Sequence, residues 1–230
     1  GKETAIAAIG DSTFKPYGIT VDSFGNLYVS GSGSNLGGGG LIYKITSSGI
    51  TSTLVGTGKP GGILASPRDI AVDSVGNVYV ADTAHNRILK ISSTGNITTI
   101  AGTGEPGFSG DGANALQAKL KGPSGVFVDS HNNIYVADTN NHRIRKISSS
   151  GIITTIAGTG TAGSSGDGGN AAQAQLYYPF SVTVDGAGYV YVADTFNSSI
   201  RKIEPNGRIT TRYRSLHSPS DVEVDSDGSL

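Results

Sequence analysis

Near-copies of one segment recur along this chain, and the repetition limits what the chain can fold into. One copy spans 67–91 and the next spans 123–147, with looser copies on both sides. Each copy carries an aspartate at the same place, and these anchors are 51, 56, 56 and 40 residues apart: Asp22, Asp73, Asp129, Asp185 and Asp225. A unit of about 40–50 residues cannot bury its own apolar faces, and this period is typical of the blades of a β-propeller.

Four short apolar runs, separated by turn residues, make up each repeat. In the third copy these runs are 125–128, 133–137, 143–147 and 152–157. The linker 129–133 begins with Asp and ends with Asn, which supply a side-chain acceptor and tolerate a left-handed backbone. The run 134–137 is apolar on both faces, as expected of a sheet packed between two other sheets. The repeat therefore predicts a four-stranded antiparallel blade, with successive blades packed radially.

Two positions recur so regularly that we expect them to be buried equally in every blade. A valine directly precedes the anchoring aspartate, at Val21, Val72, Val128 and Val184. A tyrosine follows the aspartate in the next apolar run, at Tyr28, Tyr79, Tyr135 and Tyr191. We expect Asp73, Asp129 and Asp185 to be turn residues that accept hydrogen bonds from nearby backbone, with no bound ion.

The ends of the chain hold only fragments of the repeat. Segment 4–9 resembles the last strand of a blade, and 219–230 resembles a first strand and half a hairpin. The chain begins at Gly1 and contains no methionine. We therefore expect residues 1–230 to form a single propeller domain of a longer chain, with incomplete blades at both ends. Open blade edges would otherwise invite self-association.

Composition and charge exclude several classes of function. The formal net charge is −1, which provides no general attraction for nucleic acid. The basic cluster at 201–214 contains one aromatic residue, Tyr213, for base stacking. The chain has no cysteine and therefore no disulfide or thiolate chemistry, and no apolar stretch is long enough for membrane insertion. We expect neither a nucleic-acid partner nor insertion into a membrane.

Segment 135–147 reads Tyr-Val-Ala-Asp-Thr-Asn-Asn-His-Arg-Ile-Arg-Lys-Ile, and it closely resembles the NHL repeat. Its stretch Asn-His-Arg-Ile is similar to the sequence that helped to name that family. The second copy has His-Asn-Arg-Ile at 85–88, the fourth has Asn-Ser-Ser-Ile at 197–200, and the first has the glycine-rich 31–40 instead. The resemblance covers nearly the whole chain. It implies a β-propeller, most often six-bladed, that serves as an interaction platform.

The resemblance also raises the possibility of an enzyme, because some NHL-type propellers are metal-dependent lyases with histidines in the central channel. The histidines of this chain are His85, His131, His142 and His217. Two of them lie in equivalent turns of different blades, so we do not expect three or four ligands to converge. No Gly-x-Ser-x-Gly serine has histidine and aspartate partners in order. We predict no catalytic residue, no metal site and no cofactor.

An aspartate follows Tyr-Val-Ala in three blades, at Asp82, Asp138 and Asp194. These residues could form a ring of carboxylates that binds a cation, or they could accept backbone hydrogen bonds and pair with Arg87 or Arg143. We favour the structural interpretation, because catalytic groups usually break the symmetry of a repeat.

The connections 103–122 and 159–178 are long, and each contains Ser-Gly-Asp-Gly before an alanine-rich piece. We expect a helical turn or two in these pieces, and no calcium or phosphate site, because each loop has one carboxylate and no P-loop lysine. All blades share the same core, so recognition should come from the loops that differ, and we expect a partner to bind the rim that carries these two connections. Replacing 103–122 with the shorter 56–66 should leave the fold intact and abolish binding. The candidate rim-loop binding residues are Phe108, Asp111, Asp167, Tyr177 and Tyr178.

Together these features predict a non-catalytic propeller scaffold, secreted or at the cell surface, that binds a protein or carbohydrate partner through its rim loops. The alternatives are a structural subunit of an extracellular assembly, and a metal-dependent lyase or hydrolase. The sequons at Asn96 and Asn197 lie in turns or at strand starts, which suits glycosylation of a secreted protein.

Overall fold

The computed structural model describes residues 14–33, 39–59, 61–225 and 229–230, and it confirms the predicted all-β propeller. The strands in these ranges form four four-stranded antiparallel sheets, and the strands of each sheet follow chain order. Blade 1 contains β1 (Lys15–Val21), β2 (Leu27–Ser32), β3 (Gly40–Ile45) and β4 (Thr51–Gly56), and blade 2 contains β5 (Pro67–Val72), β6 (Val78–Asp82), β7 (Arg87–Ile91) and β8 (Ile97–Ala101). Blade 3 contains β9 (Gly125–Val128), β10 (Ile134–Asp138), β11 (Arg143–Ile147) and β12 (Ile153–Ala157), and blade 4 contains β13 (Pro179–Val184), β14 (Val190–Asp194), β15 (Ser199–Ile203) and β16 (Ile209–Tyr213).

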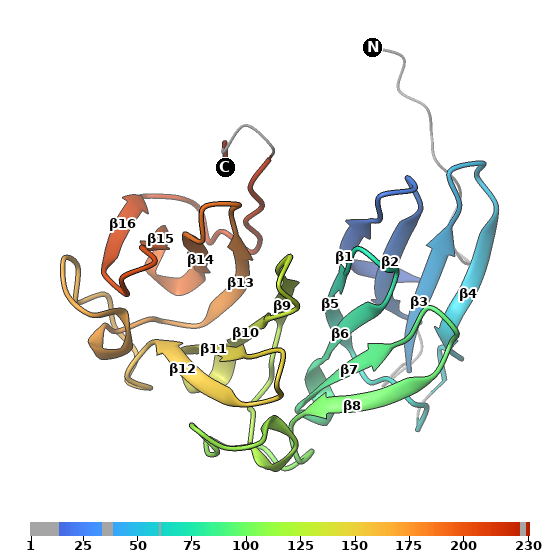
Figure 1. The fold of residues 1–230 in the computed structure, drawn as a ribbon, viewed down its shortest axis with the longest axis horizontal. Coiled ribbons are helices and arrows are strands. Elements are labelled where there is room, and N and C mark those ends of the chain that lie inside the picture. The colour runs from blue at the N-terminus through green and yellow to red at the C-terminus, as the bar shows by residue number, and fades with distance from the viewer. Residues whose placement is uncertain (1–13, 34–38, 60, 226–228) are drawn as a thin grey trace.

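The blades stand around a common centre, with the first strand of each blade innermost and the fourth outermost (Figure 1). The innermost strands contact their neighbours in order, β1 with β5, β5 with β9 and β9 with β13. In blade 3 the predicted strands agree with the observed ones to within one residue at either end. This agreement follows from the strict alternation of apolar runs and turn formers in the repeat.

A hydrogen-bonded turn joins the first two strands of each blade and explains the recurring aspartate. In blade 3, Oδ1 of Asp129 accepts the backbone N–H groups of His131 at 2.9 Å and Asn133 at 2.8 Å. Its Oδ2 accepts the side-chain amide of Asn133 at 2.8 Å and the hydroxyl of Tyr135 at 3.3 Å. The equivalent anchors of the other blades accept the same backbone and tyrosine hydrogen bonds: Asp22, Asp73 and Asp185. The prediction that the anchors are turn residues is confirmed.

The core lies in the gaps between neighbouring blades. Three apolar clusters fill the gaps between blades 1 and 2, 2 and 3, and 3 and 4. The repeated tyrosines are between 3% and 6% exposed, as predicted: Tyr28, Tyr79, Tyr135 and Tyr191. Each blade therefore depends on its neighbour for a dry interior, in the manner of repeat proteins.

The expectation that the repeated valines are equally buried is wrong. Val184 is 8% exposed, whereas Val21 is 56% exposed, and Val72 and Val128 lie between these limits. The valines of blades 2, 3 and 4 pack against the preceding blade. The described residues contain no blade before β1, so the face that carries Val21 stays open to solvent.

The two long connections are packed parts of the fold rather than free loops. Ala115, Ala118 and Leu120 are fully buried between blades 2 and 3, and the connection after β12 repeats this arrangement. Each predicted helical piece is a single 3₁₀ turn, η2 (Ala115–Gln117) and η4 (Ala171–Gln173). The expectation that 103–122 can be exchanged for the shorter 56–66 without loss of the fold stays a prediction, and the exchange would remove the buried side chains of Ala115 and Ala118.

Two of the predicted features fall on residues outside the described ranges: segment 4–9, and the middle of the glycine-rich 31–40. Segment 219–225 is described and contains no strand. Val222 in this segment is 7% exposed, and its N–H donates to Oγ of Ser181 at 3.4 Å. The segment therefore packs against blade 4 without forming the first strand that its sequence resembles.

Candidate functional site

The three aspartates that follow Tyr-Val-Ala are fully buried: Asp82, Asp138 and Asp194. In each case Oδ1 accepts a backbone N–H from the connection that precedes the blade, at 2.7 or 2.8 Å. Oδ2 of Asp82 pairs with Arg87 at 2.8 Å, as predicted. Oδ2 of Asp138 pairs with Arg145 and not with the predicted Arg143. These carboxylates tie each connection to its blade, which is the structural role that we favoured.

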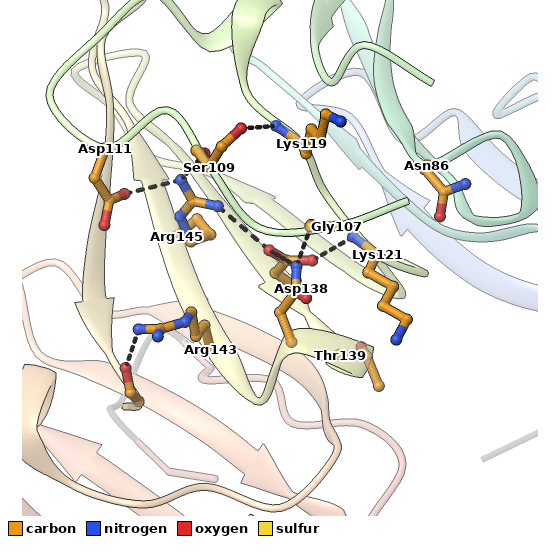
Figure 2. A network of polar contacts seen from close by, with 12 residues as sticks. Asn86, Gly107, Ser109, Asp111, Lys119, Lys121, Asp138, Thr139, Arg143 and Arg145 are labelled. Atoms are coloured by element: carbon orange, nitrogen blue, oxygen red, sulfur yellow. Dashed lines mark hydrogen bonds and ion pairs between the residues drawn. The ribbon is translucent and has the colours of Figure 1, made fainter. Parts of the chain in front are cut away.

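Arg145 is the centre of a buried clamp in blade 3 (Figure 2). Its Nη1 lies 3.3 Å from Oδ2 of Asp138, and its Nη2 lies 2.8 Å from Oδ1 of Asp111 in the connection after β8. Burial raises the pKa of Asp138 to about 6, although hydrogen bonds from Asn141 and Arg145 act in the opposite direction. The clamp therefore holds a long connection against the blade through two carboxylates and one guanidinium.

Three of the predicted rim-loop residues belong to such clamps. Blade 4 repeats the arrangement, with Arg201 between Asp194 at 3.2 Å and Asp167 at 2.9 Å. Phe108 covers the clamp of blade 3, with its ring centroid 4.9 Å from the guanidinium carbon of Arg145. Asp111, Asp167 and Phe108 therefore have structural partners, and their part in binding stays a prediction.

The two sequons lie in different surroundings. Asn96 is exposed in the turn between β7 and β8. The side-chain nitrogen of Asn197 donates to the backbone oxygen of Gly163 at 2.7 Å and to Oδ2 of Asp194 at 2.8 Å. A glycan on Asn197 would replace one of the two amide hydrogens and remove one of these hydrogen bonds, so Asn96 is the sequon that we retain as a proposed glycosylation site.

The histidines lie apart from one another. Nδ1 of His85 is 2.9 Å from Oδ2 of Asp82, His131 lies in the exposed turn between β9 and β10, and His217 is exposed before segment 219–225. In the part of the chain that the structure describes, no group of three or more His, Cys, Asp or Glu side chains is placed to hold a metal ion.

His142 and three aromatic rings form a cluster at the junction of blades 3 and 4, which we call the aromatic cluster: His142, Tyr177, Tyr178 and Phe196. The ring of Tyr178 lies 4.7 Å from that of His142, 5.4 Å from that of Tyr177 and 4.9 Å from that of Phe196. Phe196 is 53% exposed and the other members are half-buried. The sequence indicated Tyr177 and Tyr178, but it did not reveal that Phe196 and His142 join them.

The repeat shows that the fold does not require these rings. The positions of Tyr177, Tyr178 and Phe196 hold Ala65, Ser66 and Ala84 at the junction of blades 1 and 2, and Lys121, Gly122 and Asn140 at the next junction. At all three junctions the residue at the position of Phe196 donates its backbone N–H to the carbonyl oxygen of the residue at the position of Tyr177, at 3.1 Å. The same backbone frame therefore accepts alanine, serine, glycine, lysine or asparagine. The rings are an addition to one junction.

The innermost strands surround a cavity of about 260 Å³ that sequence reasoning did not single out. Asp69 lines it, and its carboxylate accepts the N–H groups of Ile70 and Val126, each at 2.8 Å. Burial raises the pKa of Asp69 to about 7, and the charges of Asp221 and Glu223 add to this shift. Glycine or serine occupies the equivalent position in the other described blades, at Gly18, Gly125 and Ser181. This break in the repeat was the available signal.

Comparison with known families agrees with this architecture. A model of the teneurin NHL domain matches residues 104–165 and 160–230, which is more than half of the chain. The chain belongs to the NHL-repeat β-propeller family. A general NHL-repeat model also matches this propeller at residues 64–91, and a β-propeller repeat model matches residues 5–38.

Individual proteins resemble the NHL propeller over most of its length. Human Teneurin-4 is 31% identical over 247 residues, which cover 91% of this chain but 9% of Teneurin-4. A streptogramin B lyase structure has a TM-score of 0.67 at 20% identity, and the match covers 96% of this chain and 62% of the lyase chain. A gluconolactonase from Xanthomonas campestris has a TM-score of 0.64 at 18% identity, and the match covers 93% of this chain and 66% of the gluconolactonase chain. At these identities the two enzyme structures establish the fold alone. Among the described residues, no helix is long and apolar enough to cross a membrane.

Proposed function

We propose that this NHL propeller is a non-catalytic extracellular module that binds a protein partner through the aromatic cluster. The observation that carries the proposal is the presence of three rings at positions where the same backbone frame elsewhere holds smaller or polar residues. Half-exposed tyrosine and phenylalanine side chains that packing does not require are typical of interface hot spots. The similarity to the teneurin NHL domain supports an interaction role.

The surroundings of the cluster favour a partner segment that combines apolar and acidic side chains. The rings of Tyr177, Tyr178 and Phe196 offer apolar faces, and the two tyrosine hydroxyls form no hydrogen bond with other described residues. Lys121 is exposed near His142 and forms no ion pair within the described part of the chain. An aliphatic or proline side chain could pack on the rings while a neighbouring carboxylate meets Lys121.

A triple variant tests this proposal: Tyr177→Ala, Tyr178→Ser and Phe196→Ala. It installs the residues of the junction between blades 1 and 2, so we expect the melting temperature to change by only a few degrees. Peptides selected from a displayed random library on the unmodified propeller should bind the triple variant about tenfold or more weakly. Surface plasmon resonance would measure the affinities.

Phe24→Ala is the matched control, because Phe24 is 74% exposed in a different turn. It should leave peptide binding unchanged, whereas Lys121→Glu should weaken the peptides that carry a carboxylate. Selected peptides that bind the triple variant as tightly as the unmodified protein would exclude the cluster as the binding surface. Ring-dependent binding on a glycan array, without peptide binding, would replace the protein partner with a carbohydrate.

An enzyme that uses the central cavity is the second candidate, and Asp69 is the observation that favours it. Its pKa of about 7 suits a general base near neutral pH, and it lies in a cavity. Hydrolysis of a panel of lactone substrates should be measured for the unmodified protein and for Asp69→Ala. Turnover that Asp69→Ala abolishes would establish an enzyme, and we expect no turnover above the uncatalysed rate.

A further inference from the structure

His142 holds the backbone of Tyr178 in place through its imidazole ring. The N–H of Tyr178 donates to Nδ1 of His142 at 3.1 Å. The φ angle of Tyr178 is 49°, in the left-handed region that bulky residues adopt only where the surroundings support it. The hydrogen bond from Tyr178 to the imidazole is therefore part of that support.

An imidazole nitrogen that accepts a hydrogen bond carries no proton, so this contact requires neutral His142. A proton on Nδ1 would place an N–H group against the N–H of Tyr178. We propose that the aromatic cluster is a pH-sensitive surface, in which protonation of His142 breaks this contact, releases Tyr178 and loosens the surface in acid. The switch stands on this geometry, and its effect on a partner rests on the proposed function.

The neighbouring junction carries the same hydrogen bond without a titratable group. There the N–H of Gly122 donates to Oδ1 of Asn86 at 2.9 Å, and Asn86 occupies the position of His142 in the repeat. Asparagine satisfies the fold at this position over the whole pH range. Histidine at position 142 thus keeps the structural contact and makes it dependent on protons.

The groups around His142 oppose its protonation. Lys121, in the connection before β9, is the charged group that acts on the ring, and Tyr177 and Tyr178 face it from the connection before β13. Arg143 directs its guanidinium to backbone oxygens of 158 and 159 instead, and no carboxylate among the described residues pairs with the ring. Burial, with a further contribution from Lys121, lowers the pKa of His142.

The direction of the pH effect follows from this shift. The folded protein favours neutral His142, so the contact is fully present above the usual histidine pKa of about 6.5. It is lost as the pH falls through the lower pKa of the folded state. A partner held by the aromatic cluster should therefore bind at neutral pH and lose affinity in acid, as the pH falls through that pKa.

The test is a pH titration of the propeller itself by NMR, with His142→Asn as the matched variant. In the unmodified protein the amide signal of Tyr178 should shift with the same midpoint as the imidazole of His142. In His142→Asn, which copies the contact of Asn86, the amide of Tyr178 should stay constant over this range. A Tyr178 amide that ignores the His142 titration, or that titrates equally in His142→Asn, would overturn the proposal.

A second arm separates the switch from the proposed function. The library-selected peptides are measured at pH 7.4 and pH 5 against the unmodified protein and His142→Asn, and the pH effect should appear only in the former. The exposed His131 is the control site, because His131→Asn should change neither the Tyr178 titration nor the binding. A Tyr178 titration without any peptide binding would retain the switch and reject the proposed function.

Discussion

A single carboxylate organises the first turn of each blade by satisfying donors from several residues. Burial alone would raise the pKa of Asp129, but hydrogen bonds from Asn133, His131 and Tyr135 outweigh it and hold the pKa below its usual value. The anchors Asp22 and Asp73 are lowered in the same way. Because the folded state favours the ionised form, this stabilisation is present above the unfolded pKa of about 3.9 and disappears as the pH falls.

Asp129→Asn tests this account of the turn. Asparagine can keep the two backbone acceptor contacts but loses the acceptor for Asn133 and Tyr135, so we expect a loss of about 1–2 kcal/mol at pH 7. The difference from the unmodified protein should shrink as the pH falls below about 4, because the carboxylate that the variant lacks becomes protonated there. Urea unfolding at pH 7 and pH 3 measures both values. Ser130→Ala, in the same turn, should be neutral, and a difference that grows in acid would contradict the assignment.

Among structural elements, the clamp that joins a connection to its blade exists in two forms. Blades 3 and 4 use a buried arginine from the third strand, Arg145 or Arg201. Blade 2 has the buried Leu89 at that position, and Asp82 pairs with Arg87 and His85 instead. The same carboxylate is therefore satisfied by different donors, which shows that the fold requires a partner for the charge rather than a particular residue.

Converting one form of the clamp into the other is a test at this scale. Arg145→Leu leaves Asp138 without its cation, and we expect a loss of about 3–5 kcal/mol in the free energy of unfolding. Adding Asn141→His copies the histidine of blade 2. It replaces the hydrogen bond that Asn141 donates to Asp138 at 2.8 Å, and a protonated imidazole there would be a charged donor, so the double variant should recover about 1–2 kcal/mol. Chemical denaturation of both variants gives the values. Equal stability of the single and double variants would mean that the two forms are not interchangeable.

At the scale of the whole molecule, the described residues leave a large apolar surface open on the face of blade 1. Tyr17, Ile19 and Val21 alternate along β1 and are 50%, 61% and 56% exposed. The residues that match Ile19 in the following blades, Ile70, Val126 and Val182, are each 3% exposed because a preceding blade covers them. An exposed apolar sheet face of this kind is a site for association.

We therefore expect the 230-residue chain to self-associate reversibly, as predicted for an open blade. Ile19→Thr should weaken the association about severalfold, because it removes apolar surface at the centre of the face. Sedimentation velocity over a range of concentrations provides the measurement. Ile63→Thr is the control, since Ile63 is 53% exposed in a connection away from β1. Equal association of both variants would place the contact elsewhere.

The sequence by itself determined the blades, their strands and their first turns. These features rest on contacts within about ten residues, such as those from Asp129 to Asn133 and Tyr135, and the repeat presents each of them several times. The buried tyrosines could also be predicted, because the alternation of apolar residues indicates which side chains face a neighbouring sheet.

Tertiary structure alone decided the partners that come from other blades and connections. It paired Arg145 with Asp111 of the connection after β8, exposed Val21, and joined Phe196 and His142 to the two tyrosines. Tyr178 and His142 are 36 residues apart, and the hydrogen bond between them depends on how two blades pack. Local patterns specify a blade, but they do not specify which side chains meet when radial packing brings neighbouring blades together.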